Sequence, residues 1–269
     1  MNILDKIIDE KRKELVKLKL LHPVQELEAR PQFSADRPSF MHALSGPGPC
    51  VIAEFKRKSP SKAYFKKDGD VLDIVPDYEK GGAAAVSILT DRHFDGRSED
   101  ILSLYGKIKI PVLRKDFIID EYQVVEARSL GASAILLIAA VLEKKEIEKL
   151  STLARSLGLD ILLELHHKEE IRKIPDEIPI IGINNRNLKS FEVNIEQSLE
   201  LAVELPGEAL KVSESGIDSE ERVMLLYRSG FQAFLMGERF MKEAEPGRAA
   251  AGFIRNLDEI YKKEMRKAG

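Results

Sequence analysis

The chain has 269 residues, and its 42 Lys or Arg against 45 Asp or Glu give a formal net charge of −3 at pH 7. This near-balance argues against nucleic acid as the main partner, because binding to a phosphate backbone needs an excess of basic residues. A hydrophobic fraction of 43% and a charged fraction of 32% are typical of globular proteins. The single cysteine, Cys50, excludes an intramolecular disulfide framework and a zinc site built from several cysteines.

Membrane insertion and secretion are not expected from the sequence. The longest nearly uncharged apolar run, residues 131–142, falls short of the roughly 20 residues that a membrane span needs. The first residues also lack the apolar core of a signal peptide. We therefore expect a cytoplasmic protein with no membrane partner.

The first 48 residues are predicted to form a helical extension before the first strand. Apolar residues recur there at helical spacing, separated by Lys and Glu: Ile3, Leu4, Ile7, Ile8, Leu15 and Leu18. Residues 38–44 indicate a second, short helix that ends before a Gly-Pro-Gly turn. These patterns favour a pair of helices packed on the domain that follows.

From residue 49 onward, the sequence repeats a junction in which a helix ends at Gly and a short apolar strand follows. Glycine suits a helix C-terminus because the chain adopts a left-handed conformation there. The junction recurs at Gly82, Gly131, Gly158 and Gly230. The numbers of residues between successive junction glycines correspond to strand–helix units of about 24 to 27 residues each. Strands are expected to begin near Cys50, Ala84, Pro111, Ala134, Ile161, Pro179, Ala209 and Ala233.

Eight short apolar strands, each followed by a helix, predict a (β/α)8 TIM barrel, an α/β fold with a closed parallel sheet. An open doubly wound sheet is the alternative, but the Gly-rich turn that often follows its first strand is absent. A last amphipathic helix is expected around residues 253–261. We predict a single domain over residues 1–269, with a helical extension at 1–48 and the barrel at 49–269.

Charged residues appear at the carboxyl ends of these strands, where the active site of a barrel lies. Residues two apart on a strand share a face, so Glu54 and Lys56 are expected on one face of the first strand. Lys115, Glu164 and Glu214 end other strands in the same way. Any one of them alone fits an ion pair or a solvated rim charge equally well. Together, in a partly dry cavity, they shift one another's pKa values as acid–base catalysis requires.

The ends of the seventh and eighth strands have a different character. Ser215, Gly216 and Gly237 are small, so their backbone N–H groups can approach a ligand closely. In barrels the loops after these two strands often hold a phosphate, although short glycine-containing loops also serve simply as turns. The two adjacent histidines after the fifth strand, His166 and His167, indicate the start of a helix and not a metal site.

A longer stretch identifies a family. Residues 52–61 read Ile-Ala-Glu-Phe-Lys-Arg-Lys-Ser-Pro-Ser and closely resemble the first-strand signature of the indole-3-glycerol-phosphate synthase family of tryptophan biosynthesis. Further stretches resemble this family in the same order, at residues 87–90, 113–117, 182–186 and 213–217. The resemblance spans roughly the whole chain, including the N-terminal helices. It implies a decarboxylating lyase with a barrel fold and with no metal or cofactor.

The resemblance also implies a substrate and a role for each residue. The substrate would be 1-(o-carboxyphenylamino)-1-deoxyribulose 5-phosphate, converted to indole-3-glycerol phosphate with loss of carbon dioxide and water. Lys115 aligns with the family's general acid and Glu164 with the carboxylate that assists proton removal and dehydration, and the supporting polar residues are Glu54, Asn184 and Glu214. Three groups of residues would bind the phosphate, the carboxylate and the anthranilate ring: Ser215, Gly216 and Gly237 with Lys56; Ser61 and Arg186; and Phe94, Phe117, Leu136 and Leu188.

Two other functions are weighed against this one. A different phosphate-binding barrel, such as a phosphoribosyl isomerase, would not need Glu54, Lys56, Lys115 and Glu164 together. An inactive barrel that serves as a binding or scaffold protein would be expected to have lost one of these groups, and none is lost. The sequence does not decide how Lys56 and Lys115 divide the acid work.

One departure from the family pattern concerns the loop after the first strand. Lys62 and Ala63 stand where the family usually has Gly soon after Ser-Pro-Ser. Because Ala restricts the backbone more than Gly does, this loop is expected to move differently. We further expect a monomer that binds a small phosphorylated substrate, with an enzyme of the same pathway as the candidate protein partner.

Overall fold

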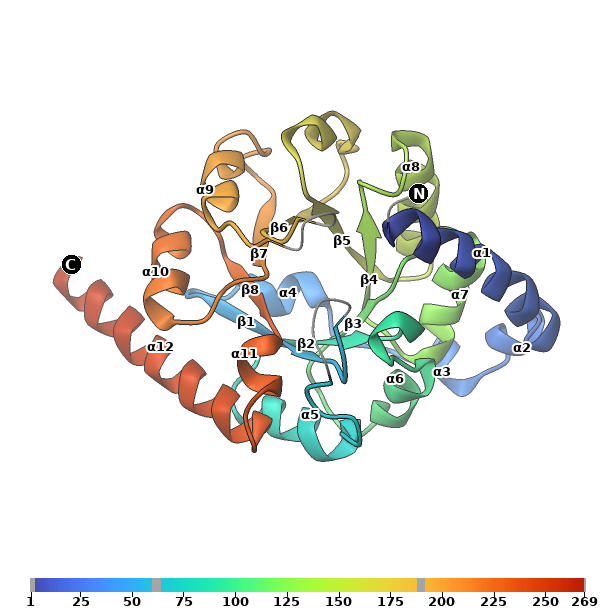
Figure 1. Ribbon diagram of the computed structural model, residues 1–269, viewed down its shortest axis with the longest axis horizontal. Helices are drawn as coiled ribbons and strands as arrows, with labels where there is room; N and C mark the ends of the chain where they lie inside the picture. Colours follow the sequence, from blue (N-terminus) through green and yellow to red (C-terminus); the bar gives the residue numbers. More distant parts are fainter. Residues whose placement is uncertain (1–2, 60–63, 188–191, 269) are drawn as a thin grey trace.

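The computed structural model describes residues 3–59, 64–187 and 192–268. Eight parallel strands pair in chain order, and β1 also pairs with β8, so the sheet closes into a barrel (Figure 1). The strands are β1 (Cys50–Phe55), β2 (Ala85–Leu89), β3 (Val112–Lys115), β4 (Ala134–Ile138), β5 (Asp160–Leu165), β6 (Ile180–Asn184), β7 (Leu210–Glu214) and β8 (Ala233–Met236). All begin at the predicted residue or next to it, so the predicted (β/α)8 barrel is confirmed.

Helices cover the outside of the barrel (Figure 1). They are α5 (Val71–Lys80), α6 (Ser98–Leu104), α7 (Glu121–Leu130), α8 (Lys144–Ser156), α9 (Glu196–Ala202), α10 (Glu220–Arg228), α11 (Glu238–Met241) and α12 (Pro246–Ala268), with 3-10 helices η1 (Arg92–Phe94) and η2 (Lys168–Lys173). Gly131 ends α7 in the left-handed region, at φ 95°, as the junction predicts. After β5 the expected α-helix is replaced by η2, because a short segment that contains Pro175 joins β5 to β6.

Alternation along each strand divides the core in two. Ile52, Leu113 and Leu162 belong to a cluster inside the barrel, whereas Val51 and Phe55 pack between the sheet and the helices. The next inward positions toward the carboxyl ends of the strands carry the charged residues noted above. The alternation therefore places charge directly above an apolar barrel floor.

In the described part of the N-terminal extension, residues 3–48, the structure has four helices and not the predicted pair: α1 (Ile3–Leu21), α2 (Val24–Glu28), α3 (Pro31–Ser34) and α4 (Phe40–Leu44). Pro23 and Pro31 cause the difference, because each starts a new helix at a point where the preceding one cannot continue. The short helix that was predicted at 38–44 is α4.

The extension reaches both ends of the barrel. At the amino-terminal end, Phe40 and Leu44 of α4 are fully buried in the interior cluster. Asp160 at the start of β5 holds α4, because its Oδ2 atom accepts hydrogen bonds from Ser39 Oγ and from the backbone N–H of Met41, both at 3.0 Å. At the other end, the first turns of α1 border the cavity described below. No helix in the described ranges combines the length and apolarity that a membrane crossing requires.

Candidate active site

A cavity of about 520 Å³ lies at the carboxyl ends of the strands. Every predicted site residue that the structure describes lines it: Glu54, Lys56, Phe94, Lys115, Phe117, Leu136, Glu164, Asn184, Arg186, Glu214, Ser215, Gly216 and Gly237. Ser61 and Leu188 lie outside the described residues. Residues distant in sequence are thus brought together as the strand-end argument predicts.

Glu54 of β1 and Lys56, which directly follows β1, form a close pair. Lys56 Nζ donates a hydrogen bond to Glu54 Oε1 at 2.6 Å, and the Glu54 side chain is almost fully buried. Gly237 lies against this pair, and a Cβ atom added there would come within 2.6 Å of Glu54 Oε1. The lack of a side chain at Gly237 therefore makes room for Glu54. This role of Gly237 is not predicted from the sequence, where its position after the eighth strand indicates a phosphate site alone.

Lys115, at the end of β3, lies between two carboxylates from other strands. Its Nζ atom is 3.2 Å from Glu164 Oε2 and 3.6 Å from Glu214 Oε2. Burial acts to lower the pKa of Lys115, but the charges of Glu164, Glu214 and Glu54 outweigh burial and raise that pKa above its usual value. Lys115 therefore carries its proton as an ammonium group at neutral pH.

Glu164, near the end of β5, is held through both of its carboxylate oxygens. Its Oε2 atom accepts hydrogen bonds from Lys115 and from Asn184 Nδ2, both at 3.2 Å, and its Oε1 atom lies 2.7 Å from His166 Nε2. Burial acts to raise the pKa of Glu164, but the positive charges of Lys115 and His166 hold it well below its usual range. Glu164 is therefore ionised when the cavity is empty of substrate.

Glu214 differs from Glu164 although both are buried carboxylates. Burial, together with the charge of Glu164, raises the pKa of Glu214 well above its usual value. Glu214 fits into the barrel because residue 182 on the neighbouring strand is glycine, where an added Cβ atom would lie 2.4 Å from Glu214 Oε1. The pKa values of these two close carboxylates are thus shifted in opposite directions, as in a coupled pair of acids.

The two sides of the cavity are chemically different. Phe94, Phe117 and Leu136 follow or belong to β2, β3 and β4 and give that side an apolar wall. Ser215, Gly216 and Gly237 follow β7 and β8. Ser215 and Gly216 both have positive φ values, 68° and 73°, so the backbone turns sharply directly after β7. Because the strands pair in chain order around the barrel, the apolar wall and this backbone loop face each other across the cavity.

Arg186 borders the cavity from the end of β6. Its guanidinium is partly exposed and lies 3.4 Å from Glu238 Oε2, at the start of α11. Within the described ranges, no group of three or more His, Cys, Asp or Glu side chains is arranged to hold a metal ion.

Comparisons with known proteins assign this site to a family. A family model described as "Indole-3-glycerol phosphate synthase" matches residues 4–253. Three proteins that carry this name are similar over most of their length. One from Bacteroides thetaiotaomicron is 44% identical over 95% of this chain and 99% of its own, one from Dechloromonas aromatica is 42% identical over 91% and 96%, and one from Acidithiobacillus ferrooxidans is 43% identical over 92% and 97%.

The chain belongs to the indole-3-glycerol phosphate synthase family. The family predicted from residues 52–61 is thereby confirmed. Among solved structures, a chain from the tryptophan synthase α2β2 complex of Pyrococcus furiosus aligns with a TM-score of 0.57 over 77% of this chain and 97% of its own. At 13% identity, that likeness supports the barrel fold alone.

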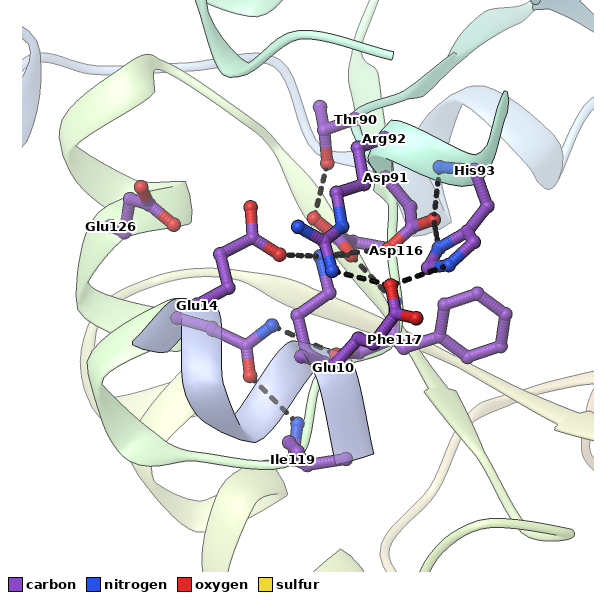
Figure 2. Close-up of polar contacts among 12 residues, drawn as sticks. Glu10, Glu14, Thr90, Asp91, Arg92, His93, Asp116, Phe117, Ile119 and Glu126 are labelled. Carbon is purple, nitrogen blue, oxygen red and sulfur yellow. Dashed lines mark hydrogen bonds and ion pairs between the residues drawn. The ribbon is translucent and has the colours of Figure 1, made fainter. Parts of the chain in front are cut away.

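In this family member, a buried lysine of the extension is inserted behind the site. Lys11 of α1 forms ion pairs with Asp91 at 2.8 Å, Asp116 at 2.9 Å and Glu14 at 3.1 Å. Asp91 and Asp116 follow β2 and β3, and Figure 2 shows them close to Glu14, with Thr90 bonded to Asp116. Asp116 lies between Lys115 and Phe117 in the chain, so the extension is anchored directly beside the catalytic candidates.

We expect Lys11→Met to destabilise the protein by about 3 kcal/mol, because it removes the lysine shared by the buried carboxylates Asp91 and Asp116, although Asp116 keeps its ion pair with Arg114. Urea unfolding followed by circular dichroism measures the change. The exposed Lys17 on the same helix provides the matched control, and Lys17→Met is expected to change stability by no more than about 0.5 kcal/mol. Equal stability of the two variants would mean that Lys11 does not hold the extension in place.

His166, the partner of Glu164, is a site residue that was not predicted from the sequence. Residues two apart along a strand share a face, which is why Glu54 and Lys56 were grouped. The same spacing separates Glu164 from His166, which directly follows β5. The adjacent His167 and the acidic residues that follow favour a helix start instead. The two-residue spacing from Glu164 is the sequence signal that identifies His166.

Proposed function

We propose that this cavity binds 1-(o-carboxyphenylamino)-1-deoxyribulose 5-phosphate and that the chain converts it to indole-3-glycerol phosphate, the product for which its relatives are named. One observation carries the proposal. A protonated lysine, Lys115, lies 3.2 Å from an ionised carboxylate, Glu164, inside a cavity with an apolar wall on one side and a sharply turned backbone loop on the other. This arrangement suits a substrate with an aromatic ring at one end and a phosphate at the other.

The polarity of the cavity orients the proposed substrate. The anthranilate ring packs on Phe94, Phe117 and Leu136, with Leu188 as a further contact proposed from the family resemblance. The phosphate binds near Lys56 and the backbone of Ser215, Gly216 and Gly237, where N–H groups and a positive charge favour an anion. Arg186 and Ser61 bind the substrate carboxylate.

Acid and base groups then act on the atoms between these two ends. As the ring carbon attacks the ribulose carbonyl, Lys115 gives a proton to the carbonyl oxygen, which becomes a hydroxyl group. Loss of carbon dioxide restores the aromatic ring. Glu164 assists removal of the proton that leaves with the hydroxyl group as water, while Asn184 and Glu214 hold Glu164 and Lys115 in place. Glu54 positions Lys56 through their 2.6 Å hydrogen bond.

The direct test supplies the purified chain with the carboxyphenylamino substrate and follows indole-3-glycerol phosphate by its fluorescence. Product formation without added metal or cofactor is expected. A chain that binds the substrate but releases no product favours a binding or scaffold role, and isomerisation of a phosphoribosyl substrate favours the alternative barrel enzyme. We also propose that the chain works as a monomer in the cytoplasm, where reducing conditions suit its single free cysteine, Cys50.

The contact between Gly237 and Glu54 gives a specific prediction. Gly237→Ala is expected to lower kcat/KM by roughly 10- to 100-fold, because the new Cβ atom displaces Glu54 and breaks its bond to Lys56. Steady-state kinetics measures the loss. Gly207 is the matched control, since a Cβ atom added there meets no other atom within 4 Å, and Gly207→Ala should retain the parent value. Parent-like kinetics for Gly237→Ala would argue that Glu54 has no essential place in the site.

A further inference from the structure

His166 is a buried histidine directly behind the catalytic carboxylate. It follows β5, is 1% exposed, and lies outside the wall of the cavity to which Glu164 belongs. Its Nε2 atom is 2.7 Å from Glu164 Oε1, and its Nδ1 atom is 3.2 Å from the backbone oxygen of Arg186. Both ring nitrogens therefore face oxygen atoms of fixed position.

These two contacts determine where the protons are. A backbone carbonyl oxygen only accepts hydrogen bonds, so Nδ1 of His166 carries a proton. The proton between Nε2 and Glu164 then belongs either to an imidazolium that donates to the carboxylate or to a carboxylic acid that donates to a neutral imidazole. In both states the pair holds the same number of protons, and the hydrogen bond keeps one orientation of the Glu164 side chain.

We propose that His166 is a positioning residue of the reaction, which fixes Glu164 through Oε1 and leaves Oε2 directed at Lys115 and the substrate. The inference rests on the proposed function, because it assumes that Glu164 assists proton removal. It adds to that function a group that never touches the substrate and acts only through Glu164. Burial supports the role, since a hydrogen bond inside the protein is stronger and more rigid than one in water.

The groups around His166 define the charge that it experiences. Glu164 of β5 faces its ring, and Glu170 of η2 accepts a hydrogen bond from its backbone N–H at 2.7 Å. Lys115 and Glu214 lie beyond Glu164, and Arg186 at the end of β6 contributes its carbonyl oxygen. Burial acts to lower the pKa of His166, but the charge and hydrogen bond of Glu164 raise it above its usual value. By the same linkage, loss of the imidazolium raises the pKa of Glu164.

Two variants separate position from charge. His166→Gln keeps a donor near the place of Nε2 but carries no charge, whereas His166→Ala removes both. We expect His166→Ala to lose roughly 10- to 100-fold in kcat with little change in KM, because Glu164 loses its anchor while the cavity wall is intact. His166→Gln should recover part of this loss. In both variants the acid limb of the kcat profile should move to higher pH, because Glu164 then protonates more easily.

The controls keep this inference apart from the function on which it rests. The exposed neighbour His167 supplies the matched variant, and His167→Gln should match the parent in kcat and pH profile. Circular dichroism and thermal unfolding establish that each variant is folded. An active parent with parent-like kcat and pH profile in His166→Gln and His166→Ala would overturn the positioning role. An inactive parent would overturn the proposed function itself.

Discussion

Replacing Lys115 with Met is expected to reduce kcat by roughly 10²- to 10⁴-fold, the contribution of a positioned general acid. Met keeps the length and much of the apolar stem of Lys but has no proton to give. Lys115 lines the cavity, and its Nζ atom lies 3.2 Å from Glu164 Oε2, on the side of Glu164 that faces away from His166 Nε2 and its contact with Oε1. Fluorescence of the product gives kcat, and circular dichroism checks the fold.

Lys149 provides the control for Lys115. It is an exposed lysine of α8 that is paired with Glu121 on the surface, and Lys149→Met should leave kcat unchanged. If Lys115→Met retained kcat within a factor of about three, the lost interaction would amount to only about 0.65 kcal/mol of the activation barrier. Lys115 would then have no place in the proton transfer, and Lys56 would become the candidate acid.

Glu164→Gln is expected to lower kcat far more than it raises KM. Gln has nearly the same shape and can keep its contact with Asn184, but it lacks the charge and basicity that proton removal needs. An interaction made mainly in the transition state affects kcat and kcat/KM together. Steady-state kinetics across a range of substrate concentrations separates the two constants.

Glu169 supplies the matched control for this change, because it is an exposed glutamate of η2 outside the cavity wall, and Glu169→Gln should match the parent. A large rise in KM for Glu164→Gln with unchanged kcat would instead identify Glu164 as a residue that binds the substrate. The acid–base assignment would then have to move to Glu54 or Glu214.

The strands and most of the site were predictable because both depend on local rules. Apolar runs of strand length and glycine at helix ends located all eight strands, and the two-residue alternation placed Glu54 above Ile52. A closed barrel then brings strand ends together whatever their distance in the sequence. The local sequence pattern predicts the same strands that the closed barrel contains, so the positions of the site residues follow without knowledge of individual side-chain contacts.

The remaining features depend on contacts that sequence pattern does not encode. The helical spacing of Ile7, Ile8 and Leu15 places Lys11 on the buried face of α1. That spacing does not indicate that Lys11 pairs with Asp91 and Asp116, which follow other strands far along the chain. The fit of Glu54 against Gly237 joins the first strand to the last, and it becomes visible only once the barrel has closed. Pro23 and Pro31, in contrast, are local signals that predict the extra helices when given their full weight.

The position of α1 has a thermodynamic consequence. Ile3, Leu4 and Ile7 line the cavity, while Lys11, one turn further along, holds the helix to the ends of β2 and β3. A ligand that contacts these apolar residues binds only the docked state of α1, so binding and docking must stabilise each other by the same free energy. Backbone amides of α1 will therefore exchange their hydrogens more slowly when the cavity is occupied. The N-terminal extension precedes the barrel in the sequence, yet hydrogen exchange in α1 reports whether the cavity of the barrel is occupied.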